Sequence, residues 1–186
     1  AKQRVMIAVL TVFGIVVAGL LSPSHAAQCT HKIGSILSLT GAYGAHGVPI
    51  SRAAQLGVEQ VNEARKQLGV GCELVYDVRD SNTQASVAVD AARKLIDLEG
   101  VTALVGPISS GITAPLLSSV TVEEEVLVIA TASTSSTFTN MGKRGETKGL
   151  FFRTLPADSL QAVAAAKMAY DAGFRRPAIL YWNNDW

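Results

Sequence analysis

The stretch IGSILSLTGAYGAHGVP, residues 33–49, decides the fold. It opens with an apolar run, residues 33–38, that predicts a buried strand. Glycines interrupt the chain after this run, and Pro49 then suits the first turn of a helix, where a missing amide donor costs nothing. Apolar residues that recur at helical spacing predict a helix over residues 49–68. The glycine spacing does not match a dinucleotide-binding fingerprint, so we do not expect a nucleotide at this loop.

The remaining chain repeats the alternation of strand and helix. Further strands are predicted over residues 73–77, 101–105, 127–130, 151–154 and 178–181. Further helices are predicted over residues 85–98, 111–122 and 158–172. Strands that alternate with helices imply right-handed crossovers and a parallel sheet that is covered on both faces. The sequence therefore predicts a doubly wound α/β fold.

The composition fits one sizeable folded core and gives no sign of catalysis. Of the 186 residues, 48% are hydrophobic and 17% are charged, which excludes a disordered chain. A formal net charge of +1 leaves no field to hold nucleic acid, so we expect no nucleic-acid partner. The chain has no GxSxG elbow, Walker loop or HExxH motif, and the spacing of His46, Asp158 and any serine does not support a triad. With two cysteines and three histidines, we expect no metal, no cofactor and no enzyme.

The N-terminal segment has the pattern of a secretory signal peptide. Lys2 and Arg4 precede an apolar run, residues 5–21, and small residues follow it up to Ala26. This order predicts a signal peptide over residues 1–26, and therefore an exported protein. The alternative is that the apolar run stays in place as an uncleaved membrane anchor.

The two cysteines are expected to form a disulfide. Cys29 lies just before the first predicted strand and Cys72 just before the second. Neighbouring parallel strands would bring these two starts together, and export would favour oxidation. The alternative is a pair of buried free thiols.

Polar residues gather after two of the predicted strands. Ser110 follows the third strand and is expected to cap the next helix, whose first amides would then face an anion. Ala132 and Thr134 lie in a polar stretch, residues 131–139, after the fourth strand. Open α/β sheets bind ligands at the carboxyl ends of their strands, so we expect these residues to share a cleft, with His46 on its rim. Hydroxyls and main-chain amides there would hold a carboxylate, whereas the alternatives are an ordinary helix cap and a plain linker.

The order of several short motifs resembles a known family. The motifs are Ile33-Gly-Ser, Leu39-Thr-Gly41, Gly47, Gly106-Pro-Ile-Ser-Ser110, Ala130-Thr-Ala-Ser-Thr134, Arg153-Thr154 with Asp158 and Gln161, and Tyr181-Trp-Asn-Asn-Asp-Trp186. Together they resemble the branched-chain amino acid binding proteins, which are type I periplasmic binding proteins that serve ABC importers. The resemblance covers about residues 30–186. It implies that residues 27–155 are lobe one, that residues 156–186 begin lobe two, and that the chain is truncated at its C-terminus.

The resemblance also assigns roles to individual residues. Ser110 falls where the family holds the ligand carboxylate, and Ala132, through its backbone, and Thr134 complete the carboxylate and ammonium contacts. Asp158 falls near the hinge, and Trp186 matches the aromatic residue that closes from lobe two.

The ligand and the partner follow from the same resemblance. His46 stands where many members carry an aromatic residue, which predicts an altered side-chain subsite. The hinge is expected near Leu155-Pro156. The implied function is a monomeric periplasmic protein that delivers an amino acid, or a similar small molecule, to a membrane permease. The alternative is a membrane-anchored sensory domain for amides, urea or amino acids.

Overall fold

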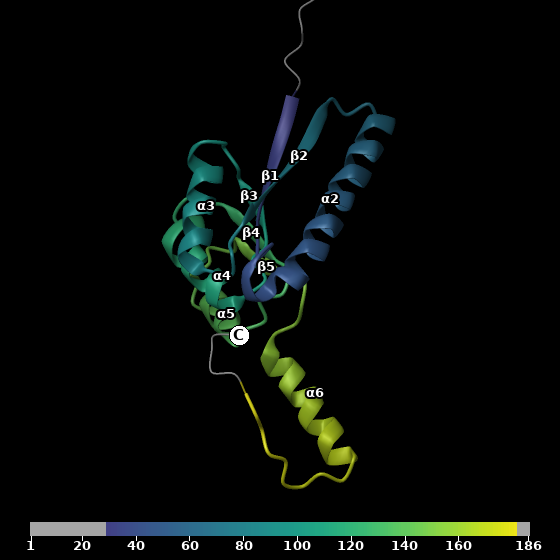
Figure 1. The fold of residues 1–186 in the computed structure, drawn as a ribbon, viewed down its shortest axis with the longest axis vertical. Coiled ribbons are helices and arrows are strands. Elements are labelled where there is room, and N and C mark those ends of the chain that lie inside the picture. The colour runs from purple at the N-terminus through teal and green to yellow at the C-terminus, as the bar shows by residue number, and fades with distance from the viewer. Residues whose placement is uncertain (1–28, 182–186) are drawn as a thin grey trace, which may run out of the picture.

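The computed structural model describes residues 29–181 of the chain (Figure 1). The predicted signal peptide, residues 1–26, and the predicted closing residue Trp186 lie outside the described residues. Within the described part, no helix is both long and apolar enough to cross a membrane.

Five parallel strands form one sheet. They are β1 (Cys29–Leu37), β2 (Cys72–Asp80), β3 (Ala103–Val105), β4 (Leu127–Ala130) and β5 (Phe151–Arg153). Their order across the sheet is β2-β1-β3-β4-β5, and every neighbouring pair is parallel. The predicted parallel α/β fold is therefore confirmed.

Helices lie on both sides of this sheet, and the last helix extends away from it (Figure 1). They are the 3₁₀ turn η1 (Gly41–Tyr43), α2 (Gly44–Gln67), α3 (Ala85–Asp97), α4 (Ser110–Leu116) with its π-helical continuation η2 (Leu117–Thr121), α5 (Ser136–Lys143) and α6 (Asp158–Asp171). The chain crosses the sheet in one direction through α2 and in the other through α3, so crossovers of one hand place these helices on opposite faces. Figure 1 shows α2 on one side of the strands and α3, α4 and α5 on the other.

The hydrophobic core lies between the sheet and the helices α3, α4 and α5. Ile36 and Leu104 contribute from the sheet, Leu95 from α3, Leu116 from α4 and Phe138 from α5, and all five are buried. On the other face, α2 contacts β1 and β2. Beyond them, Ile129 of β4 and Phe152 of β5 are exposed.

Two helix predictions need correction. The helix predicted over residues 49–68 begins earlier, at Gly44. Gly47 does not break it: a Cβ at this position would lie 1.8 Å from the Ser38 carbonyl oxygen, so the residue lets α2 pass close to the end of β1. The helix α5 was not predicted, because its serines and threonines were interpreted as a loop. Ser135 caps this helix by accepting a hydrogen bond from the Thr137 amide.

The strand predicted over residues 178–181 is wrong. These residues have no regular structure, and the side chains of Ile179, Leu180 and Tyr181 are exposed. Strand propensity depends on a neighbouring strand to pair with, and none pairs here among residues 29–181.

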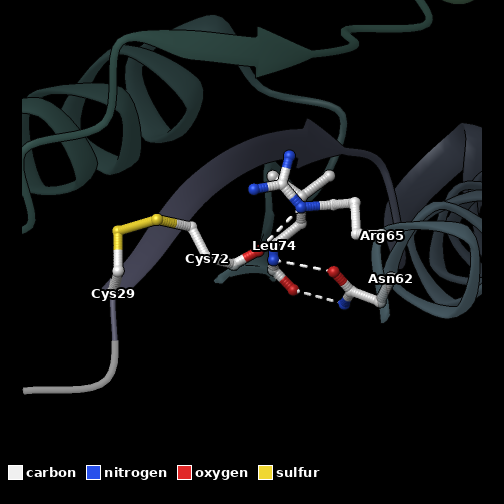
Figure 2. Close-up of a disulfide and its surroundings, with 5 residues drawn as sticks. All are labelled: Cys29, Asn62, Arg65, Cys72 and Leu74. Atoms are coloured by element: carbon white, nitrogen blue, oxygen red, sulfur yellow. Dashed lines mark hydrogen bonds between the residues drawn. A yellow bond between two sulfur atoms is a disulfide. The ribbon is translucent and has the colours of Figure 1, made fainter. Parts of the chain in front are cut away.

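A disulfide joins the starts of β1 and β2, as the sequence predicted (Figure 2). Cys29 and Cys72 are direct register partners, with their Cα atoms 4.5 Å apart. Two residues of α2 hold the same end of β2. Asn62 bonds the amide and the carbonyl of Leu74, both at 2.8 Å, and the Arg65 side chain donates to the Cys72 carbonyl at 2.7 Å.

Candidate functional site

The carboxyl ends of the strands meet where the chain reverses its direction across the sheet. The loops after β1 and β3 are neighbours there, and their connections leave to opposite faces. Open α/β sheets bind small molecules at such a switch point.

The loop between β3 and α4 passes very close to β1. Gly106 has a φ of +103°, and a Cβ there would lie 2.2 Å from the Ile36 carbonyl oxygen, so only glycine fits. The predicted helix cap at Ser110 is wrong: Ser109 precedes the helix, and Ser110 is its first residue. The Thr113 hydroxyl and amide both donate to the Ser109 carbonyl.

The loops after β3 and β4 are joined by a buried serine that the sequence analysis did not single out. The Ser133 hydroxyl lies 2.6 Å from the Thr113 hydroxyl and 3.2 Å from the Ile108 carbonyl oxygen. Both side chains are fully buried. These contacts fix the spacing of the two loops, so any ligand between them meets a preformed surface.

Ser110 and Thr134 come together through these loops. The Ser110 hydroxyl accepts a hydrogen bond from the Ser135 amide at 3.2 Å. Thr134 is 7% exposed, and its hydroxyl has no hydrogen-bond partner among residues 29–181. The hydroxyls of Tyr76 and Thr121 are also buried without a partner within these residues, so this property alone does not single out Thr134.

Arg153 at the end of β5 supports the loop from the other side. Its guanidinium donates to the Ser135 carbonyl at 2.9 Å, to the Ser133 carbonyl at 3.4 Å and to the Thr139 hydroxyl at 2.6 Å. The sequence analysis quoted Arg153 only as part of a motif. A single arginine at the end of the strand that follows the Ser/Thr-rich stretch 131–139 was the available signal.

The other predicted site residues are less closely connected. The Asp158 amide donates to the Thr134 carbonyl at 2.9 Å, so the start of α6 touches the same loop. Ala132 is half-buried between Thr131 and Ser133. His46 is exposed in the first turns of α2, and no hydrogen bond within the described residues joins it to the loops after β3 and β4.

Asp80 organises the neighbouring loops after β1 and β2. Its carboxylate accepts hydrogen bonds from the amides of Leu39, Thr40 and Asn82, and from the Thr40 hydroxyl. Burial raises the pKa of Asp80, but the Thr40 hydroxyl and the three amides together outweigh it and hold the pKa below its ordinary value. The carboxylate is therefore the form that fixes this part of the edge.

One open depression lies at the opposite end of the sheet. It has a volume of about 450 Å³ and lies between the last turns of α2 and the start of β2, where Cys72 and Glu73 line it. The candidate ligand site is instead the loop junction at the carboxyl edge, because open α/β sheets bind ligands there and the Ser110 hydroxyl meets the Ser135 amide at that junction.

A parallel sheet with polar loops at this edge defines an α/β ligand-binding lobe. The model of the family described as periplasmic binding protein matches residues 30–186, and the chain belongs to this family. This assignment agrees with the resemblance found in the sequence.

Individual relatives support the same assignment. The chain is 35% identical over 135 residues to the Leu/Ile/Val-binding protein BraC3 of Rhizobium johnstonii, covering 73% of this chain and 34% of that protein. It is 33% identical over 160 residues to the chemotactic signal transduction system substrate-binding protein BasB of Halobacterium salinarum. That match covers 82% of this chain and 37% of BasB. The structure also resembles the branched-chain amino acid transporter substrate binding protein LivJ of Streptococcus pneumoniae in complex with isoleucine. That match has a TM-score of 0.60 and 26% identity, and covers 70% of this chain and 35% of the other. The chain thus spans about a third of the length of these relatives.

Proposed function

We propose that the protein is the extracytoplasmic substrate-binding component of an ABC importer. Its ligand is a branched-chain amino acid or a similar small carboxylate, which it delivers to a permease in the membrane. The observation that carries this proposal is the junction of the loops after β3 and β4, where the Ser110 hydroxyl accepts a hydrogen bond from the Ser135 amide beside Thr134. Support also comes from the Leu/Ile/Val-binding relative at 35% identity.

The proposed site holds the ligand carboxylate with neutral donors. The hydroxyls of Ser110 and Thr134 and the backbone at Ala132 would face it. Arg153 does not need to touch the ligand. Its guanidinium is bonded to the carbonyls of the same loop, so its positive charge lies behind the site and favours an anion there.

The start of a second lobe is proposed for residues 156–186, with the hinge near Leu155-Pro156. None of the residues of α6 is buried in the described structure, and Leu160 and Val163 are largely exposed. These side chains are suited to the interior of a second lobe. Asp158, whose amide contacts the Thr134 carbonyl, would then face the ligand from the closing side, together with His46 at the rim and Trp186.

A second candidate is a sensory role. The relative BasB is described as a chemotactic signal transduction substrate-binding protein. For the sensory role, residues 5–21 would remain uncleaved and serve as a membrane anchor. The N-terminus of the mature protein distinguishes the two: cleavage after Ala26, measured by intact-mass spectrometry, supports a released periplasmic protein, and retention supports the sensor.

The ligand proposal is tested by calorimetry of the intact protein. The panel contains leucine, isoleucine, valine, small amides, urea and aromatic carboxylates. Thr134→Val keeps the shape of the side chain but removes its hydrogen bond, and should weaken the best ligand by about 1–3 kcal/mol. Ser110→Ala should act in the same direction.

The matched control is Thr102→Val. Thr102 is exposed at the amino end of the sheet, so this variant should bind like the wild type. Unchanged affinity in both site variants would remove the loop junction from the ligand site. Binding of none of the panel would reject the proposed ligand class.

A further inference from the structure

Three chemically reactive side chains meet at the end of the sheet that is far from the ligand site. They are Cys29, His31 and Cys72, and their sulfur and imidazole nitrogen atoms all lie within 4.8 Å of one another. The sequence analysis expected no metal site, because the chain has two cysteines and three histidines. Strand pairing adds the third member, because Cys72 is the register partner of Cys29.

Strand geometry explains why the three side chains share one face. Cys29 and His31 are two residues apart on β1 and so point to the same side. Cys72 lies directly opposite Cys29 and points to that side as well. Cys29 and His31 are exposed, so solvent, a reductant and a metal ion can reach the group.

Arg65 of α2 places a positive charge at the main chain of Cys72. Its guanidinium donates to the Cys72 carbonyl at 2.7 Å, as Figure 2 shows. A nearby cation stabilises the thiolate form of cysteine, which is the form that binds metals.

We propose that reduction of the Cys29–Cys72 disulfide converts this end of the sheet into a zinc-type metal site. The two thiolates and the His31 imidazole supply three ligands, and water fills the fourth, exposed position. Two sulfurs and one nitrogen are the ligands that Zn²⁺ prefers in tetrahedral sites. The oxidised protein lacks the site, because the two sulfur atoms of a disulfide are uncharged and are not thiolate ligands.

A dithiol can serve as the reductant of the Cys29–Cys72 disulfide. The dithiol gives two electrons and two protons to the disulfide, and leaves as its own cyclic disulfide while Cys29 and Cys72 become thiols. Binding of Zn²⁺ then releases one proton from each thiol. The two forms exclude each other, so metal binding protects the reduced form and oxidation expels the metal.

The test titrates Co²⁺ and Zn²⁺ into the protein before and after reduction. The protein is reduced with dithiothreitol, which is removed under nitrogen, and Co²⁺ binding is followed by the thiolate-to-metal absorption bands. The reduced protein should bind one equivalent, Zn²⁺ should displace it, and the oxidised protein should show no such bands. Cys29→Ser should abolish the bands, and His31→Ala should weaken binding by about tenfold or more.

The control is Glu73→Gln, which removes a carboxylate next to Cys72 that lies on the opposite face of β2. It should bind the metal like the wild type. If reduction unfolds the chain, added Zn²⁺ should restore its circular dichroism and raise its melting temperature. Binding to the reduced protein that is no tighter than to Cys29→Ser, or unchanged binding in His31→Ala, would overturn the proposed three-ligand site.

Discussion

The two faces of the sheet are stabilised by different kinds of interaction. Between the sheet and α3, α4 and α5 lies a continuous apolar core, in which Leu104 is 1% exposed. On the other face, α2 buries only Gly47, and Leu56 and Val61 of this helix are about half exposed. There the disulfide and hydrogen bonds from side chains to the backbone also join β1, β2 and α2.

The comparison of the two faces shows how a sheet can be stabilised where little apolar area is buried. Apolar burial stabilises in proportion to the area removed from water, so it favours the α3 side strongly and the α2 side weakly. Cross-links and fully paired polar groups replace it on the α2 side. The free energy of unfolding should therefore respond to different kinds of substitution on the two sides.

The largest effect is expected in the apolar core. Leu104→Ala leaves a cavity beneath α3 and should lower the free energy of unfolding by about 2–5 kcal/mol, measured by urea denaturation. Leu56→Ala is the matched control on α2, where the side chain is 53% exposed, and it should cost less than about 1 kcal/mol. Equal losses in the two variants would contradict the comparison.

The next largest effect is expected at the disulfide. The double variant Cys29→Ser, Cys72→Ser opens a covalent loop with a sequence separation of 43 residues. It should lose about 2–4 kcal/mol in urea denaturation, with a chelator present to remove metals. Reduction should destabilise the wild type by a similar amount and leave the double variant unchanged. If reduction did not change the stability of the wild type, α2 and its hydrogen bonds would be sufficient to stabilise this end of the sheet without the disulfide.

A smaller and pH-dependent effect is expected at Asp80. Because its pKa is lowered in the folded protein, its carboxylate stabilises the fold above the ordinary value of 3.8, and this stabilisation is lost as the pH falls through the lower, folded value. Asp80→Asn should therefore lose about 1–2 kcal/mol at neutral pH. Melting curves of the two proteins should converge only when the pH falls below the lowered, folded pKa of Asp80, because both side chains are neutral there. A constant difference at every pH would assign the effect to packing instead.

The smallest effect is expected where α2 bonds β2. Asn62→Ala removes two hydrogen bonds to the backbone of Leu74, and water can replace part of each, so we expect a loss of about 1 kcal/mol. Gln55→Ala is the control, since within residues 29–181 the Gln55 side chain bonds only Glu59, on the exposed surface of α2. Indistinguishable denaturation midpoints for the two variants would show that the polar link carries no stability of its own.

Much of the fold could be predicted from the sequence because apolar periodicity reports burial directly. This periodicity predicted the strand β1 and the helix α3. The helix α5 was missed because most of its residues are polar and only Phe138 is buried. The strand at 178–181 was predicted from composition alone, although a strand also needs a neighbour.

The candidate site was predictable to a smaller extent. Loops at the carboxyl edge could be located from strand order, and Ser110 and Thr134 do lie at one junction. The roles of Ser133 and Arg153 depend on contacts between segments that are distant in the sequence. The same reason explains the Cys29, His31 and Cys72 cluster: register, not spacing along the chain, brings its third member into place.

The pairing of β1 and β2 has a consequence for the way the fold comes apart. Residues 29–33 pair with residues 72–76 alone, because β3 joins β1 only at Gly34 and Ser35. The two strands at an end of this kind would ordinarily separate first at their tip. The disulfide sits at that tip and closes it. The cross-link should therefore oppose separation of the two strands at this end, so amides near the tip should exchange more slowly in the oxidised protein than after reduction.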